Sequence, residues 1–315
     1  MTFPLRPTGL LLAGALFFTA PALLGCQDGA GIETAPATLE TSEALDVLPS
    51  SQFVGMIDFA AARRSDAVGP MLNGPMSPFG QDSPEMDEVK RLTGFDPATD
   101  LDRMYVAGSE TDEAGAVVAF ARFDRERLER YIADQDEASL TRTDVEGVPA
   151  WTASEDGQAF MVALPSERMM MAGSESVVRG MLARLASGSK GLSGDTRMMD
   201  LIGKAGQSGA WMVVSGLDAA TGNDPASQVS AFADRAVISF GFEDTGLALD
   251  AYLVPRDGAA TSDVADLTRG AVSAMRVEAA SQPDLMTMLD GVDVSDDGSG
   301  VRVTGTAPAS FLNRQ

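Results

Sequence analysis

Closely spaced strand candidates between Ser139 and Gly173 constrain the fold more than any other feature of the chain. They cover residues 139–145, 148–154, 158–165 and 168–173, and turns such as Glu-Asp-Gly and Pro-Ser-Glu separate them. Sequential strands with such short connections must be antiparallel, because a parallel neighbour needs a crossover of about a dozen residues or more. The sequence therefore predicts an antiparallel sheet.

Amphipathic helix candidates lie among the strands. Apolar residues recur at helical spacing in residues 124–135, and the Asp124 carboxylate is placed to cap the first turn. Glu126 and Arg130 are expected to pair at i,i+4 on the solvated face of this helix. The other main helix candidates are residues 175–186, with Ser174 as the cap, and residues 262–280.

A segment rich in glycine and serine, residues 187–194, interrupts these patterns. We expect a first half over residues 48–194 and a second half over residues 195–315. Gly173-Ser174 and Gly305-Thr306 occupy similar places, between a strand pair and a helical segment, which suggests an internal duplication. The predicted fold class is α+β, with two related halves that each pack helices on one face of an antiparallel sheet.

The N-terminal segment carries a different kind of signal. Residues 1–25 contain Arg6 as their only charged side chain and an apolar stretch from Gly9 to Phe18, which is typical of a signal peptide. The stretch is too short for a transmembrane helix, which needs about 20 apolar residues. The residues that follow match the lipobox of bacterial lipoproteins one by one: Leu23, Leu24, Gly25 and Cys26.

This resemblance to bacterial lipoproteins implies that Cys26 becomes the first residue of the mature chain and carries acyl groups such as palmitate. Several acyl chains hold a soluble domain firmly on a bilayer, where one chain does not. Residues 26–47 are then expected to form the lipidated N-terminus and a flexible tether. Gln27, in place of an aspartate, implies the periplasmic face of the outer membrane rather than the inner membrane. The alternative is an ordinary secretory signal with a thiol nearby.

The body of the chain resembles a family of bacterial envelope proteins of unknown function. The similar segments read LPSSQFVGMIDF, EVKRLTGFDPATDLDRMYVAG, GVPAWTAS and MMMAGSESVVRGMLARLASG, and they extend from Leu48 to Leu201. The resemblance supports a place in the cell envelope and carries over no catalytic residue.

Composition removes most enzyme mechanisms. The chain has no histidine and one cysteine, so Ser-His-Asp and Cys-His catalysis are excluded. Lys190 and Lys204 lie where solvation keeps a lysine charged, which disfavours a Ser-Lys dyad. Trp151 and Trp211 stand in apolar strands, where core packing explains them better than sugar stacking in a glycosidase. A formal net charge of −23 disfavours nucleic acid as a partner. We predict that the chain is not an enzyme.

Metal sites are weak alternatives in this sequence. Asp293, Ser295 and Asp297 fit the start of a calcium loop, but Thr304 stands where such a loop has a bidentate glutamate, so a hairpin turn is favoured. The methionines suggest a Cu(I) site, although core filling is the default for methionine at strand and helix spacing. They are Met169, Met170, Met171, Met198, Met199, Met286 and Met288. We predict no cofactor.

Taken together, these features predict a lipid-anchored protein of the cell envelope that acts as a non-catalytic binding or scaffold module. Its expected partners are the membrane, through the anchor, and another envelope protein. The alternative function is a carrier that holds an apolar ligand in a cavity between helices and sheet, since abundant methionine can line an adaptable pocket.

Overall fold

The computed structural model describes residues 39–72, 84–109, 115–134, 140–155, 158–217, 229 and 231–309. These residues form two compact units. Unit 1 contains the residues up to 60 and those from 71 to 195, and unit 2 contains residues 61–70 and those from 196 onward. The sequence division did not anticipate that residues 61–70 belong with the second half, where the Ser65 hydroxyl donates to the Glu243 carbonyl at 2.9 Å.

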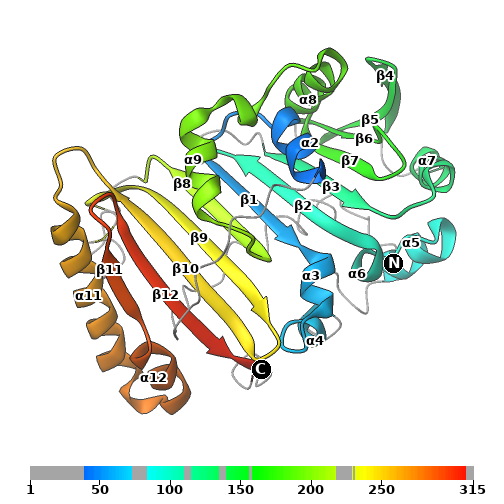
Figure 1. The fold of residues 1–315 in the computed structure, drawn as a ribbon. Helices are drawn as coiled ribbons and strands as arrows, with labels where there is room; N and C mark the ends of the chain where they lie inside the picture. Colours follow the sequence, from blue (N-terminus) through cyan, green and yellow to red (C-terminus); the bar gives the residue numbers. More distant parts are fainter. Residues whose placement is uncertain are drawn as a thin grey trace. The chain divides into compact units, whose positions relative to one another are not determined.

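Unit 1 is built on an antiparallel sheet with strand order β1-β2-β3-β7-β6-β5-β4 (Figure 1). The strands predicted between Ser139 and Gly173 are confirmed as β4 to β7, which pair in sequence. The strands are β1 (Phe53–Asp58), β2 (Leu101–Gly108), β3 (Ala116–Ala121), β4 (Thr141–Val145), β5 (Val148–Glu155), β6 (Gln158–Ala163) and β7 (Met169–Ser174). The helices are α2 (Leu39–Val47), α3 (Phe59–Arg64), which runs into unit 2, α5 (Pro84–Thr93), α6 (Pro97–Asp100), α7 (Arg125–Ala133), α8 (Glu175–Ser187) and the short η2 (Leu192–Gly194).

Helices lie on both faces of the unit 1 sheet. Tyr105 and Met171 share a row of paired residues through β3 and therefore point to the same face. Helix α2 covers that face, because the hydroxyls of Thr41 and Tyr105 are hydrogen-bonded at 2.8 Å. Met170 points to the opposite face, where it packs in the cluster that contains Leu128 of α7. The predicted α+β class is confirmed. The prediction that helices pack on one face of the sheet only is wrong for unit 1.

Unit 2 repeats this arrangement. Its antiparallel strand order is β8-β9-β10-β12-β11, with α11 beside β11 (Figure 1). Val264 of α11 packs with Leu253 on one face, while the Lys204 amine of α9 lies 4.2 Å from the ring centroid of Tyr252 on the other. The elements are the first half of α4 (Gly69–Leu72), whose residues 71 and 72 belong to unit 1, α9 (Thr196–Lys204), β8 (Ala210–Ser215), β9 (Ala233–Glu243), β10 (Gly246–Pro255), α11 (Thr261–Glu278), η3 (Ala279–Ser281), α12 (Pro283–Asp290), β11 (Asp293–Asp296) and β12 (Val301–Pro308).

The two units share their connectivity. In each, a helix precedes a three-stranded meander, a second helix crosses the opposite face, and the last strand returns beside the third. This is what an internal duplication predicts. The residue correspondence differs from the predicted one, however. Ser174 is the last residue of β7, whereas Gly305 and Thr306 lie inside β12, where Thr306 pairs with Ala248 of β10.

Helix α2 corrects the predicted tether. The tether was expected to extend to residue 47, but residues 39–47 are helical, and Ala44 and Leu45 are almost completely buried. The Asp46 carbonyl accepts a hydrogen bond from the Gly191 amide at 2.6 Å. A Cβ on Gly191 would come within 2.2 Å of the Leu48 carbonyl oxygen, so glycine is required there. The polar residues at the start of this segment concealed a helix whose apolar side belongs to the core.

The two predicted helix caps have different outcomes. Asp124 is confirmed as the N-cap of α7, since its carboxylate accepts from the Arg127 amide at 3.0 Å. Ser174 stands at the N-cap position of α8, but its hydroxyl makes no capping hydrogen bond and is buried without a partner in the described part of the chain.

Candidate functional site

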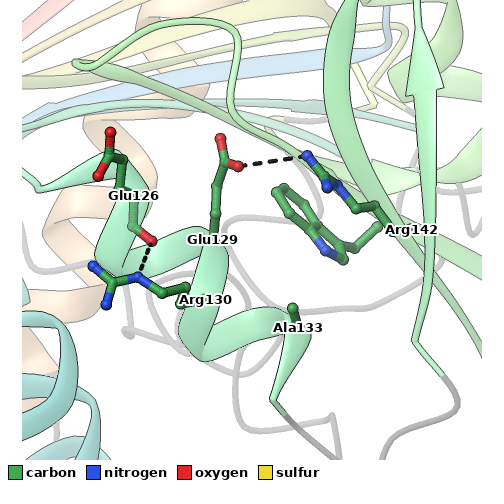
Figure 2. A pocket seen from close by; sticks show the side chains of 6 residues that line it. Glu126, Glu129, Arg130, Ala133 and Arg142 are labelled. Atoms are coloured by element: carbon green, nitrogen blue, oxygen red, sulfur yellow. Dashed lines mark hydrogen bonds and ion pairs between the residues drawn. The ribbon is translucent and has the colours of Figure 1, made fainter.

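A hollow of about 270 Å³ opens on the surface of unit 1 where α7 lies against β4 and β5. Its walls combine charged side chains with one aromatic ring (Figure 2). The amphipathic pattern of α7 produces this arrangement, because Leu128 turns inward and the neighbouring glutamates and arginines remain outside. The lining residues are Glu126, Glu129, Arg130, Ala133, Arg142 and Trp151.

Trp151 is the one aromatic residue that lines the hollow. Only 2% of its surface is exposed, and it packs with Leu128 and Leu164, which confirms the prediction that it belongs to the core. Its indole Nε1 is buried and has no hydrogen-bond partner among the described residues. The guanidinium carbon of Arg142 lies 6.0 Å from the centroid of the ring. The sequence indicated the buried ring but not the unused N–H group.

The charged side chains around the hollow pair differently from the prediction. Arg130 Nε donates to the main-chain carbonyl of Glu126 at 3.2 Å, so no i,i+4 contact with the Glu126 carboxylate is made by this group. The i,i+4 pair on α7 joins Arg125 to Glu129 at 2.8 Å. Glu129 also lies 3.7 Å from Arg142 of β4, and Figure 2 shows Glu129 between Arg130 and Arg142.

A second charged cluster holds α2 on the sheet of unit 1. Arg103 donates to Asp58 at 2.8 Å and lies 3.3 Å from Glu40 of α2. Arg168 lies 3.3 Å from the other oxygen of Glu40 and 2.9 Å from Asp102. Periodicity within a segment cannot find this cluster, because its members come from α2, β1, β2 and the segment before β7.

Burial acts in opposite directions on the pKa of Arg103 in this cluster and on that of Tyr105, which contacts α2 through Thr41. Burial disfavours the charged guanidinium of Arg103, but the hydrogen bond and the charge of Asp58 outweigh it and raise the pKa of Arg103. Burial also raises the pKa of the Tyr105 hydroxyl, against the hydrogen bond with Thr41, which acts in the opposite direction. The raised pKa values keep Arg103 charged and Tyr105 protonated at neutral pH. The cluster therefore acts as a structural attachment for α2.

The calcium candidates form a hairpin. Asp293 and Ser295 belong to β11, which pairs with β12. The Asp297 carboxylate accepts hydrogen bonds at 2.8 Å from the Ser299 amide, the Ser299 hydroxyl and the Gly300 amide. A carboxylate oxygen with these donors is poorly placed to ligate a cation. Among the described residues, no three or more His, Cys, Asp or Glu side chains form a group that could hold a metal ion.

Acid pH is expected to weaken unit 2 through Asp297. The Ser299 hydroxyl, followed by the Ser299 amide, lowers the pKa of this carboxyl. Its stabilising contribution is therefore complete above the usual aspartate range and is lost as pH falls through the lowered pKa. In urea unfolding between about pH 5 and pH 2, the wild type should lose stability more steeply than Asp297→Asn, which keeps an acceptor oxygen. Asp293→Asn is the charge-matched control. Equal slopes for all three proteins would contradict the expectation.

The methionines proposed for copper are not brought together. Strand alternation sends Met169 and Met171 to one face of the unit 1 sheet and Met170 to the other. Met198 and Met288 are buried in unit 2. Met169, Met171, Met198 and Met288 fill cores, as the default for methionine predicted, whereas Met199 and Met286 are only partly buried.

The predicted lipidation site lies outside the described residues. This applies to Leu23, Leu24, Gly25 and Cys26 and to the whole predicted signal peptide. Among the residues that are described, the helices are too short or too polar to cross a membrane.

The geometry defines a two-unit α+β protein with a charged hollow on unit 1. No family model matches the chain, and no curated protein matches it. Its fold is similar to that of TP0453. Crystal form I of TP0453 matches with a TM-score of 0.50 and 9% identity over 90% of this chain and 96% of that chain. Crystal form III matches with a TM-score of 0.51 and 10% identity over 85% of this chain and 96% of that chain. At these identities the likeness concerns the fold alone.

Proposed function

We propose that this chain is a lipid-anchored protein of the cell envelope that acts as a non-catalytic binding or scaffold module. The observation that carries the proposal is the hollow between α7 and β4–β5, whose walls offer charged groups of both signs. Such groups recognise a polar partner by contact. The anchor is inferred from the lipobox that ends at Cys26, and Gln27 favours the outer membrane.

The proposal of a non-catalytic role rests on the chemistry available. The chain contains no histidine, and lipidation would use its one thiol. Around the hollow, Glu129 is engaged by Arg125 at 2.8 Å, which suits recognition better than proton transfer.

The carrier alternative receives less support from the described residues. A carrier needs apolar side chains that line an open space. Met161, Met171 and Met181 instead have no accessible surface, so no space large enough for a water molecule lies beside them. The surface hollow is therefore the better candidate for contact with a partner.

One experiment tests the anchor and the binding role together. The photo-crosslinking residue p-benzoylphenylalanine replaces Ala133 at the rim of the hollow, or Gly270 on α11 as a control, since open space surrounds a Cβ at Gly270. Each chain is produced in its own cells with Cys26 intact and as Cys26→Ser.

We expect the intact chain to fractionate with outer membranes and Cys26→Ser to become soluble. We also expect a reproducible adduct from position 133 in membranes and none from position 270. Membrane association of Cys26→Ser would overturn the anchor. Absence of an adduct from position 133, or equal adducts from both positions, would overturn the binding role of the hollow.

A further inference from the structure

We infer that β4 is an edge for self-association, at which two copies of this chain pair their β4 strands antiparallel about Thr143. This inference goes beyond the proposed function, which concerns the hollow, and takes from it only the shared membrane. Strand β4 ends the strand order of unit 1 (Figure 1). The hairpin of β4 and β5 has no counterpart among the described residues of unit 2, where β11 and β12 correspond to β6 and β7. The extra hairpin therefore creates this edge.

The main-chain groups of Arg142 and Asp144 point away from β5. Val145 and Val148 are paired across a two-residue loop, and both loop residues, 146–147, have positive φ, which is the geometry of a type I′ hairpin. The residues that close such a loop are hydrogen-bonded to each other, and hydrogen-bonded pairs alternate along an antiparallel ladder. The N–H and C=O groups of Arg142 and Asp144 therefore lie on the outer side of β4.

Pro149 supports this assignment independently. It stands opposite Asp144 and has no N–H group, and its carbonyl accepts a hydrogen bond from the Leu164 amide at 3.3 Å, on the side of β6. The main chain of Asp144 therefore makes no ladder hydrogen bond to β5. No described residue donates to, or accepts from, the outward main-chain groups of Arg142 and Asp144.

The edge strand of unit 2 differs in this respect. Arg269 of α11 donates to the Val294 carbonyl of β11 at 3.0 Å. Proteins protect exposed edges in such ways, because a row of unpaired N–H and C=O groups is a template for another strand. Since no described side chain makes an equivalent hydrogen bond to β4, its outer side is open to an added strand.

The charges of β4 select a second copy of this chain as the added strand. Strand β4 reads Thr-Arg-Thr-Asp-Val. Antiparallel pairing about Thr143 sets Arg142 opposite Asp144 of the second copy, and the reverse. Both pairs fall at the positions whose main-chain groups point outward, so one register satisfies the charges and the hydrogen bonds together. Opposite charges directly across two strands stabilise the pairing, and like charges oppose it.

The membrane supplies the concentration that this small interface needs. The chain has a formal net charge of −23, so the approach of two copies requires a local attraction such as this register provides. One pair of five-residue strands buries less surface than a stable dimer in solution requires. The anchor of the proposed function would confine both copies to one surface and raise their effective concentration.

Disulfide trapping tests the register. Thr143→Cys places the two thiols at the two-fold axis, where the Cα atoms of a non-hydrogen-bonded pair are about 4.5 Å apart, a separation that suits a disulfide. Thr141→Cys is the matched control on the same face of β4, since its two copies would lie about 13 Å apart along the strand. Both variants keep Cys26, and the wild type measures background crosslinking through Cys26. Intact cells are oxidised with copper phenanthroline, and two tags of different size on co-expressed chains identify a dimer of this chain.

Charge exchange distinguishes this register from chance collision. Arg142→Asp or Asp144→Arg, each added to Thr143→Cys, replaces two attractive cross-strand pairs with two repulsive pairs. Co-expression of the two charge variants produces chains that are complementary only to each other. The Asp144 carboxylate also accepts from the Gly147 amide at 2.9 Å, and Arg142 lies near Trp151. Urea unfolding of the purified variants therefore confirms that each one is folded.

We expect about tenfold more dimer from position 143 than from position 141 or the wild type, because only position 143 meets the distance for a disulfide. Each charge variant alone should lose most of this dimer, and co-expression of both should restore it between chains with different tags. Equal dimer from positions 143 and 141, no dimer from folded Thr143→Cys, or a disulfide with another protein in its place would overturn the inference. Charge variants that crosslink like their parent, or that fail to restore the dimer together, would also overturn it. The adduct from position 133 and the fractionation of Cys26→Ser decide separately whether the proposed function stands.

Discussion

Replacing Met171 with alanine is expected to lower the free energy of unfolding of unit 1 by about 2–5 kcal/mol. Met171 has no accessible surface and stands at the centre of the sheet, where it pairs with Val118 of β3 and Ala163 of β6. The α2 side of the sheet covers it, so the surrounding chain cannot easily close the space left by the thioether. Loss of the buried atoms and the remaining cavity both contribute to the cost.

Met170→Ala is the matched control for this prediction. Met170 is the adjacent residue, points to the opposite face and is only partly buried. Urea unfolding followed by tryptophan fluorescence compares the two variants with the wild type. Met171→Ala should be the less stable by more than about 1 kcal/mol, since the cost follows the buried area and the cavity that remains. A larger loss for Met170→Ala would mean that the core of β7 lies on the α7 face.

Local sequence patterns correctly predicted β4 to β7 and α7 of unit 1, but they predicted neither helix α2 nor the placement of the helices on the sheet. Tight turns required β4 to β7 to be antiparallel, and helical spacing after Asp124 located α7. Those patterns show which side of a helix is apolar, but they do not show on which face of the sheet the helix packs. Both faces of β7 carry methionine, so hydrophobicity alone could not tell that α2 and α7 lie on opposite sides.

The candidate site was predictable only in its parts. Trp151 stood in an apolar strand and was expected to be buried, which the structure confirms. Its lack of a hydrogen-bond partner depends on how α7 crosses β5, and no local pattern records that crossing. Helical spacing allows both Arg125 with Glu129 and Glu126 with Arg130 as i,i+4 pairs, and it could not show that Glu129 also approaches Arg142 of β4, which follows α7 in the sequence.

Removal of the Arg103 guanidinium is expected to lower the free energy of unfolding strongly, because the buried Asp58 carboxylate then loses the opposite charge of Arg103. Arg103 is the hydrogen-bond donor to Asp58, whose surface is only 8% exposed, and it also contacts Glu40 of α2. Loss of one partner from a buried ion pair costs about 3–5 kcal/mol. Because the Arg103 side chain retains 22% exposure, we expect Arg103→Met to cost about 2–4 kcal/mol.

A second substitution separates this charge effect from lost packing. If the cost arises from the carboxylate that remains, Asp58→Asn in the Arg103→Met background should restore at least about 1 kcal/mol, because a neutral amide is less costly to bury than a charge. Arg179→Met breaks an exposed pair with Glu175 and should cost less than about 0.5 kcal/mol. Urea unfolding of the four proteins provides the measurement. A further loss of stability in the double variant would show instead that Arg103 supports α2 through the packing of its aliphatic chain.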